Sequence, residues 1–384
     1  MIRVFVLLLV SIFLASLYNN KTPIQEQQFG NTTTQSYSSG MNFAFLLLLI
    51  ILVLFSGLRT QMNDTITYAA TFLSDSATPA GFGTLFSVDW NLGSHPLFLI
   101  FQRLVKTVFG SNSQWFILCH AIIVVSSYLL FLRKYSYNFF WSVFTLLAFT
   151  VYAFSMAAMK QVMAIAVGIW AIPLLLQKRY VKGIIILIFA MLFHPYVFIL
   201  FVCAFLSDGV WTKKTWMIII VSVLGFFAFS KFVNMASDVA EYLGKEYQYE
   251  NLTASGVSFA RVIAYGIIPI FSFLTRNRIN EQNDPMLNMA VNGTIVSFGF
   301  MLIASNGGAV LLGRISGYFN VFTCLAVPFI LESLSEEYKK PLKAVFVLFQ
   351  LLFYFTYYRS YLYAYCNGNW FADIYNHASI FSLF

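Results

Sequence analysis

Charged residues are scarce in this chain of 384 residues and make up only 10% of it. Soluble domains carry about 25% charged residues. A soluble chain of this length could bury a large core, but so few charges could not cover that core with a water-facing surface. Hydrophobic residues reach 59% and aromatic residues 19%. This composition excludes a soluble enzyme, a disordered chain and a disulfide-rich secreted domain, and it predicts an integral membrane protein.

Several chemical motifs are also missing. The four cysteines form no CxxC pair or metal-ligand spacing, and three of them, Cys119, Cys203 and Cys324, lie inside apolar runs. No glycine-rich phosphate loop follows a predicted strand. No Asp-x-Asp pair is present to hold a metal-bound nucleotide sugar. We therefore expect no metal, no cofactor and no nucleotide-dependent chemistry.

The net charge of +8 comes from 23 Lys and Arg against 15 Asp and Glu. No basic run interleaved with aromatic residues lies in a polar segment, so nucleic acid is excluded as a partner. Basic residues collect in the cytoplasmic loops of membrane proteins. A site for an anionic lipid phosphate would add more of them.

Continuous apolar segments predict an all-α, polytopic transmembrane helix bundle of about 10–12 spans, since one span needs about 20 residues. Continuous runs also exclude a transmembrane β-barrel, whose strands alternate. A shorter segment, 96–109, reads as an amphipathic interfacial helix or a re-entrant piece. The eleven expected spans are 2–18, 42–58, 114–132, 137–156, 161–177, 183–206, 215–232, 259–275, 286–305, 315–332 and 341–358.

Basic loops orient the bundle, because loops rich in Lys and Arg face the cytoplasm. Segment 183–206 has such a loop at each end, so a single crossing would place one of them outside. A hairpin of two short helices that turns near His194-Pro195 keeps both inside, and proline favours a break there. The predicted cytoplasmic loops contain Arg133 with Lys134, Lys178 with Arg179 and Lys182, Lys213 with Lys214, Arg276 with Arg278, and Lys339 with Lys340.

With this orientation the chain, 1–384, is one integral membrane domain whose long loops, 59–95 and 233–258, lie on the outer face. The predicted cytoplasmic loops are short and leave no room for a cytosolic domain. Any chemistry is therefore expected at the outer face, on a substrate that arrives there without a nucleotide.

Four cations fall at predicted outer boundaries, where basic residues should be rare. They are Arg59, Lys160, Arg261 and Arg314. Four cations at one face indicate an anionic ligand, and a lipid diphosphate fits because the guanidinium fork matches phosphate oxygens. The alternative is that each is an ordinary interfacial or loop cation.

Histidine and acidic residues offer the acid–base chemistry. His194 lies in the middle of an apolar run, where an ionisable group is costly and indicates function unless it is simply a packed histidine. Its ordinary pKa of about 6.5 suits a general base. Asp64 is a second candidate base, and Tyr68 four residues later would share its helix face. Tyr318 likewise follows Arg314 by four residues, whereas His120 reads as a packing residue.

Five short motifs follow one another along residues 45–335. They are Gly57-Leu58-Arg59 with Asp64 and Tyr68, Lys160-Gln161, Lys178-Arg179, Leu192-Phe193-His194, and Gly313-Arg314-Ile315 with Tyr318-Phe319. In these motifs, their order and their spacing, the chain resembles the EpsG family of Wzy-like polysaccharide polymerases.

Two departures from the family are visible. The family often has Arg at the position of Lys160, so this chain keeps the cation and loses the bidentate fork. The family often has Glu-Pro-Gly near Ser94-His95-Pro96, so His95 is either a loop residue or part of the site.

The resemblance implies a GT-C-like glycosyltransferase in the bacterial inner membrane with its active face outward. Such an enzyme joins oligosaccharide repeat units carried on undecaprenyl diphosphate, which serve as donor and acceptor, without a metal or cofactor. Membrane lipid and a chain-length regulator protein are its expected partners. By this analogy the four cations bind the donor diphosphate, His194 or Asp64 deprotonates the acceptor hydroxyl, and the remaining substrate contacts come from Tyr68, His95, Gln161 and Tyr318.

Two other classes stay open from the residues alone. An O-antigen ligase, or a glycosyltransferase that uses a polyprenyl-phosphate sugar, would use the same outer face and similar cations. A flippase or other transporter would instead have internal repeats and charges that line a mid-membrane cavity. The sequence has no clear repeat, and most of its charges lie at the faces.

Overall fold

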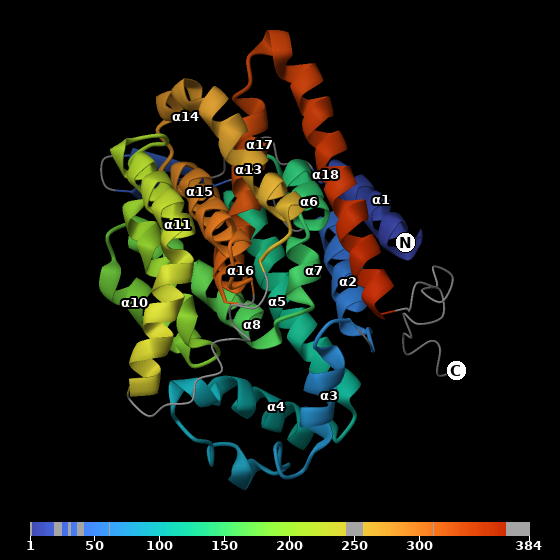
Figure 1. Ribbon diagram of the computed structural model, residues 1–384. Helices are drawn as coiled ribbons and strands as arrows, with labels where there is room; N and C mark the ends of the chain where they lie inside the picture. The colour runs from blue at the N-terminus through green and yellow to red at the C-terminus, as the bar shows by residue number, and fades with distance from the viewer. Residues whose placement is uncertain are drawn as a thin grey trace. The chain divides into compact units, whose positions relative to one another are not determined.

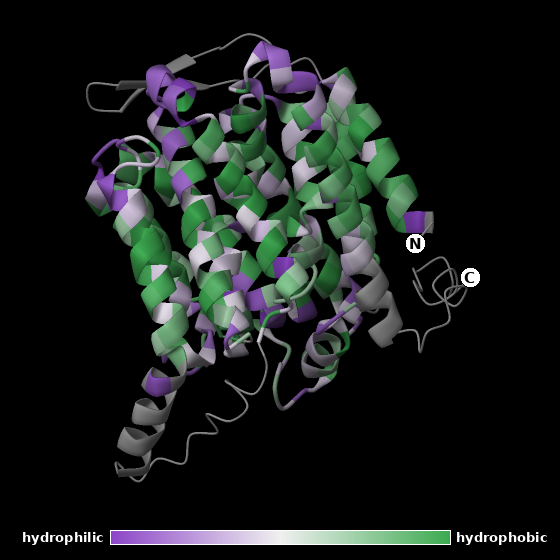
Figure 2. Cartoon of the chain, turned by 45° about the horizontal axis from the view of Figure 1, so that its top comes forward, coloured by the Kyte–Doolittle hydropathy of each residue, from purple (hydrophilic) through white to green (hydrophobic). Residues whose placement is uncertain are grey.

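The computed structural model describes residues 2–18, 25–29, 32–36, 42–60, 62–242, 256–309 and 311–365. The predicted all-α class is confirmed. The regular secondary structure of the described ranges is helical apart from one small sheet, in which β1 (Gln25–Phe29) pairs with β2 (Thr32–Ser36). Hydrophobic residues line the middle of the helices, and hydrophilic residues gather near helix ends and connections (Figure 2).

The chain divides into two compact units, and each is described by itself. Unit 1 comprises residues 1–27, 35–201 and 354–384, and unit 2 comprises 28–34 and 202–353. The expectation of one membrane domain stays a prediction.

In unit 1 the helix α5 (Ser113–Tyr135) occupies the centre and packs against α2, α3, α4 and α8. Asparagine starts three helices of this unit. Asn42, Asn112 and Asn138 each accept a hydrogen bond from a backbone N–H in the first turn of α2, α5 and α6. The other helices of unit 1 are α1 (Ile2–Leu17), α2 (Phe43–Gly57), α3 (Thr65–Leu73), α4 (Pro96–Phe109), α6 (Phe139–Ala148), α7 (Val151–Ser155), α8 (Met159–Gly168), α9 (Ile172–Leu176) and α10 (Tyr180–Met191), with 3₁₀ helices at Phe82–Thr84, Leu92–Ser94 and Ile169–Ala171.

The expected span 137–156 is wrong as a single helix. It breaks between α6 and α7, where Thr150 adopts a left-handed backbone conformation with φ 66°. Such a conformation cannot continue a right-handed helix. The segment 96–109 does form one helix, α4, and Figure 1 shows it running crosswise to α2 and α5 of the same unit, as expected for an interfacial helix.

The predicted break near His194-Pro195 is confirmed. Helix α10 ends at Met191, and a 3₁₀ helix, η4 (Pro195–Phe205), follows it. Both sides of the break return to one point on α8. A Cβ added to Gly168 would lie 2.9 Å from a Val197 methyl carbon and 3.6 Å from a Leu187 methyl carbon. The chain therefore folds back on itself, as the hairpin requires.

Unit 2 is organised around α15 (Pro285–Ser305), which packs against α11, α13, α16 and α17. Pro285 occupies its first turn, and the carboxylate of Asp284 accepts hydrogen bonds from the N–H groups of Met286 and Leu287. The other helices are α11 (Lys213–Tyr242), α13 (Phe259–Leu274), α14 (Arg276–Gln282), α16 (Leu312–Ser316), α17 (Asn320–Glu332) and a 3₁₀ turn at Gly317–Phe319, while α18 (Glu336–Tyr365) extends past 353 into unit 1.

Four helical stretches are long and apolar enough to cross a membrane. A fifth is reached if α13 and α14, bent by 70° at their junction, count as one span. Five further apolar helices are shorter than a full span, so the described residues carry fewer full-length spans than the eleven expected. The four stretches are Ser113–Tyr135, Met159–Leu176, Pro285–Ser305 and Leu312–Glu332. The chain is thus a multi-pass membrane protein.

Candidate functional site

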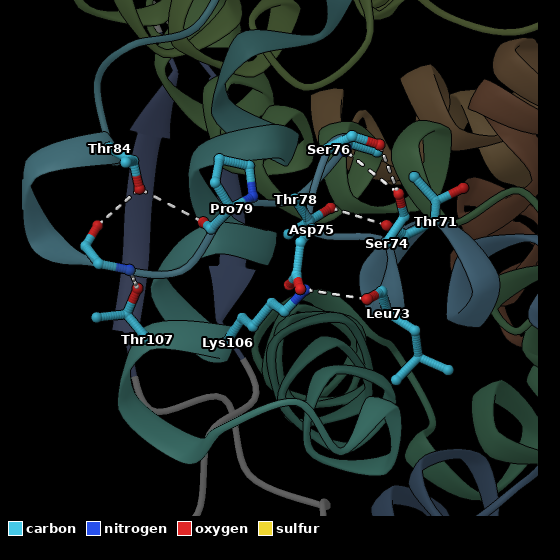
Figure 3. A network of polar contacts seen from close by, with 12 residues as sticks. Thr71, Leu73, Ser74, Asp75, Ser76, Thr78, Pro79, Thr84, Lys106 and Thr107 are labelled. Carbon is cyan, nitrogen blue, oxygen red and sulfur yellow. Dashed lines mark hydrogen bonds and ion pairs between the residues drawn. The ribbon is translucent and has the colours of Figure 1, made fainter.

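A loop, 74–94, is fastened to α4 by a buried lysine. The Lys106 ammonium donates hydrogen bonds to the Leu73 carbonyl oxygen at 3.2 Å and to an Asp75 carboxylate oxygen at 2.8 Å (Figure 3). The side chain of Lys106 is 0% exposed, whereas that of Asp75 is 90% exposed. The Lys106 ammonium is therefore hydrogen-bonded inside the protein and does not face lipid headgroups.

Arg103, one turn earlier on α4, fastens the same loop. Its guanidinium donates to the carbonyl oxygens of Thr84 at 2.6 Å and Ser87 at 2.9 Å. The two basic residues that made 96–109 look amphipathic are thus covered by this loop. The same loop exposes three large aromatic side chains, Phe82, Phe86 and Trp90.

The start of α4 brings two histidines together. The Leu97 N–H donates a 3.1 Å hydrogen bond to the Leu192 carbonyl, which joins α4 to the break between α10 and η4. As a result the imidazole rings of His95 and His194 stack, with centroids 5.3 Å apart and planes 16° from parallel. The Tyr196 ring lies edge-on to His194 at 5.4 Å. Ninety-nine residues of sequence separate these histidines, and the fold makes them neighbours.

Each of these histidines directly precedes a proline that begins a helix. Pro96 starts α4, and Pro195 starts η4. His95 has φ 56° and ψ 56°, a left-handed conformation that is unfavourable for a residue with a Cβ. Strain of this kind persists only where the surroundings impose it, and it gathers at functional sites.

Lys160 completes this group, which we call the histidine–lysine site (His95, His194 and Lys160). It lies in the first turn of α8, half-buried, with its ammonium 5.9 Å from the centre of the Phe98 ring. Tyr68 packs edge-on against the same Phe98 ring at 5.6 Å. Within the part of the chain that the structure describes, Lys160 enters no ion pair.

The electrostatics of the site keep His95 neutral. Burial and, to a smaller extent, the nearby Lys160 charge lower the pKa of His95 to about 4, while a hydrogen bond with the Phe193 backbone acts in the opposite direction. The Nδ1 atom of His95 is buried and has no hydrogen-bond partner among the described residues. At neutral pH the His95 imidazole is therefore neutral, and it lies close enough to Lys160 to respond to its charge.

Arg59 does not have the exposed position that a direct diphosphate contact requires. It is 0% exposed, and its guanidinium donates to neutral oxygens: the Thr65 hydroxyl at 3.0 Å, the Ser56 carbonyl and hydroxyl, and the Met156 carbonyl at 3.0 Å. The boundary position predicted from sequence corresponds to the end of α2, but the side chain points into unit 1. The fold thus assigns Arg59 to the interior.

The remaining candidates of unit 1 lie close to Lys160 in sequence or along α3. Gln161 is buried in the first turn of α8, and Asp64 is half-buried immediately before α3. The Tyr68 N–H donates to the Asp64 carbonyl at 3.0 Å, as in one helical turn. Asp64 therefore lies a single turn from the ring that contacts Phe98.

In unit 2, Arg261 and Arg314 lie near one packed corner. The Val257 N–H donates to the Ala304 carbonyl at 2.9 Å, and a Cβ added to Gly313 would lie 3.6 Å from a Val257 methyl carbon. Arg314 follows Gly313 directly and is exposed, while Arg261 is four residues beyond Val257 and is half-buried. Both arginines thus lie at this end of α13, α15 and α16.

Arg314 and Tyr318 differ in burial, since Arg314 is exposed and Tyr318 is 1% exposed. The chain passes from α16 into a 3₁₀ turn at Gly317–Phe319, which rotates Tyr318 further about the helix axis than an α-helix would. That the two side chains share one helix face stays a prediction. In this structure Tyr318 packs in the interior.

A buried polar network lies behind these arginines. The Asn320 amide donates to the Tyr265 hydroxyl at 2.9 Å, and the Ser297 hydroxyl contacts the Asn320 amide oxygen at 3.2 Å and the Ser316 hydroxyl at 2.7 Å. Tyr265 is one turn past Arg261, and Ser316 is two residues past Arg314. Sequence reasoning missed this network, because isolated Ser and Asn residues inside apolar helices carry no distinctive spacing.

Sequence reasoning also missed the histidine pairing, although a signal was present. The dipeptide His-Pro occurs twice, as His95-Pro96 and His194-Pro195. No group of three or more His, Cys, Asp or Glu side chains within the described ranges could hold a metal ion. The three cysteines in those ranges, Cys119, Cys203 and Cys324, form no disulfide.

Comparison with known proteins supplies a family. Searches of curated proteins and of solved structures each found no match. The sequence profile of the EpsG family matches residues 42–373, a range that contains every candidate residue described above. The chain therefore belongs to the EpsG family, a family of Wzy-like polysaccharide polymerases and glycosyltransferases.

Proposed function

We propose that this protein polymerises oligosaccharide repeat units carried on undecaprenyl diphosphate, at the outer leaflet of the bacterial inner membrane. Membership of the EpsG family supports a membrane polysaccharide polymerase in general terms. The repeat units act as both donor and acceptor, and a chain-length regulator is the expected protein partner.

One observation carries the proposal: a half-buried cation near the neutral His95, on whose ring His194 stacks. Lys160 has no ion-pair partner in the described ranges, and a partly desolvated ammonium attracts an anion more strongly than one in water. A lipid diphosphate would supply that anion. His194, stacked on neutral His95, lies beside it to accept a proton.

The reaction balances without a nucleotide. The acceptor hydroxyl oxygen attacks the anomeric carbon of the donor sugar, and a new glycosidic C–O bond forms. The bond between that carbon and the diphosphate oxygen breaks, and the lipid diphosphate leaves with the electron pair. His194 takes the hydroxyl proton and returns it to solvent, while Lys160 stabilises the charge that develops on the leaving group.

Within unit 2, Arg261 and Arg314 remain candidate diphosphate ligands in this proposal. A guanidinium group can bind two phosphate oxygens at once, a geometry that an ammonium does not offer. Arg314 is exposed and Arg261 is half-buried. Asp64 remains the alternative base, and Tyr68 and Gln161 remain candidate sugar or phosphate contacts.

The test is a gel of surface polysaccharide from a deletion strain that carries the wild-type gene or the Lys160→Met variant. We expect the wild type to restore a long-chain ladder and the variant to leave single lipid-linked repeats. Lys182→Met is the matched control, because Lys182 is exposed on α10 and lies outside the site. Immunoblots of membranes must show equal amounts of each protein.

Other outcomes would overturn the proposal. An intact ladder that lacks one sugar in the deletion strain indicates a transferase that adds a side branch. Loss of transfer to a lipid A core indicates a ligase. Repeats trapped on the cytoplasmic leaflet indicate a flippase.

A further inference from the structure

Lys160 depends on the short turn that precedes it. Helix α7 ends at Ser155 and α8 begins at Met159, so only Met156, Ala157 and Ala158 separate them. Ala158 has φ −66° and ψ 69°, and no side-chain cap closes the start of α8. The position of the Lys160 ammonium is therefore set by whatever holds this turn.

Arg59 holds the first residue of the turn. Its Nη2 donates a 3.0 Å hydrogen bond to the Met156 carbonyl, and its Nη1 and Nε are used on Ser56 and Thr65. The guanidinium thereby links the end of α2 to the turn, across 97 residues of sequence. Hydrogen bonds from a charged donor are stronger than neutral ones, and this donor is fully buried.

His120 holds the residue after the turn. Its Nε2 lies 3.1 Å from the Met159 carbonyl oxygen. A carbonyl only accepts hydrogen bonds, so Nε2 carries the hydrogen and donates it. His120 is 0% exposed and lies on α5. Arg59 and His120 thus hold the carbonyls of Met156, the first residue of the turn, and of Met159, the residue that follows it.

The donors are themselves fixed. The Gln114 amide nitrogen on α5 donates to the Gly57 carbonyl at 2.6 Å and contacts the Arg59 carbonyl at 3.3 Å. Gly57 lies so close to α5 that an added Cβ would meet a Leu118 methyl carbon at 2.5 Å. The Gly57-Leu58-Arg59 sequence is therefore locked to the helix that carries His120.

We infer that Arg59 and His120 are positioning residues that fix the turn before α8 and thereby hold the Lys160 ammonium beside His95 and His194. Neither contacts substrate, because both are fully buried. The inference rests on the proposed function for its catalytic consequence alone, since the placement of Lys160 is a structural property that can be measured without substrate.

The first experiment measures that placement directly. The full-length protein in detergent is treated with a water-soluble amine-reactive reagent, and mass spectrometry follows modification of Lys160, with Lys182 as the internal reference. We expect His120→Leu to change the rate of Lys160 modification by about threefold or more, because the reactivity of a half-buried amine depends on its position. His120→Gln should match the wild type, since its amide nitrogen can donate where Nε2 did.

The second experiment measures catalysis with lipid-linked repeat units. We expect His120→Leu to lower kcat by about tenfold to a hundredfold with little change in KM, and His120→Gln to restore it. Arg59→Lys keeps the buried charge but cannot reach Ser56, Thr65 and Met156 together, so kcat should also fall. His120→Gln and His120→Leu keep the test decisive if the Arg59 variant fails to fold.

The outcomes separate the two proposals. An unchanged Lys160 modification rate in well-folded His120→Leu overturns the positioning inference, even if Lys160→Met abolishes the polysaccharide ladder. A changed rate in a protein that makes no polymer overturns the proposed function and leaves the positioning inference standing. A kcat loss that His120→Gln does not rescue also contradicts the inference.

Discussion

The two units present their cations in opposite ways. Unit 1 hides Arg59 completely, satisfies it with neutral oxygens, and leaves Lys160 half-buried beside two histidines. Unit 2 leaves Arg314 exposed and Arg261 half-buried, close to a network of uncharged hydroxyl and amide groups. The four cations look equivalent in sequence, but Arg59 has a structural role, whereas Lys160, Arg261 and Arg314 remain candidate ligand contacts.

The largest effect should come from exchanging the buried guanidinium. Arg59→Met leaves the Met156 carbonyl and other buried acceptors without a donor, so we expect a loss of about 3 kcal/mol or more of stability. Arg314→Ala removes an exposed group and should change stability by no more than about 0.5 kcal/mol. Thermal unfolding in detergent measures both, and equal losses would break the comparison between the units.

The next effect separates chemistry from binding. Because His194 is assigned the proton transfer, His194→Gln should lower kcat by about a hundredfold to ten-thousandfold at normal protein abundance. Full activity in this variant would transfer the role of base to another group, with Asp64→Asn as the next variant to examine.

Arg314→Ala should abolish chain extension without lowering protein abundance. Arg314→Lys is its matched control, because it keeps the charge and loses the bidentate fork, and it should keep partial activity. The measurement is the polysaccharide ladder with an immunoblot. A wild-type ladder from Arg314→Ala would remove this residue from the site.

The acid stability of unit 1 should depend on His95. Its pKa is lowered from 6.5 to about 4 in the folded protein, so between these values the unfolded chain binds a proton that the folded chain does not. The contribution of His95 to stability is thus complete above pH 6.5 and is lost as the pH falls toward 4. Melting temperatures across this range should fall less steeply for His95→Gln than for wild type, and identical slopes would contradict the assignment.

The smallest effects concern the loop fastened to α4. Asp75→Asn should cost no more than about 1 kcal/mol, because Asp75 is 90% exposed and its ion pair with Lys106 is screened. Lys106→Met should cost about 1–3 kcal/mol, because it also leaves the Leu73 carbonyl without its buried donor. Proteolysis within 74–94 would report the loss of attachment. A larger loss of stability in Asp75→Asn than in Lys106→Met would contradict this account.

Much of the helical framework follows from the sequence. Long apolar runs predicted α5 and α15 to within a few residues, and Pro195 together with the basic loops predicted the fold-back after α10. The same reasoning failed at Thr150, because a left-handed residue between two apolar helices leaves no gap in hydropathy. It also ended α18 at 358, whereas the helix continues to Tyr365.

Individual residues of the site could be predicted from the sequence, but most of their arrangement in space could not. Lys160 and His194 stood out because ionisable groups in apolar runs are costly. Their proximity to His95 depends on the contact between Leu97 and Leu192, which no local pattern encodes. The burial of Arg59 depends on a carbonyl 97 residues away, so charge and boundary position alone suggested a ligand contact. The predicted outer loop 233–258 begins too early, because α11 continues to Tyr242, and residues 243–255 lie outside the described ranges.

The capture of Arg103 and Lys106 by the loop over α4 changes the meaning of the net charge. Both side chains already serve carbonyl oxygens or Asp75, as Arg59 serves Met156. Hydrogen bonds to carbonyl dipoles leave these charges in place, so they still contribute to the long-range field of the formal +8. These side chains already donate to internal acceptors, however, so direct contacts with an approaching lipid diphosphate fall to cations such as Lys160, which is only half-buried.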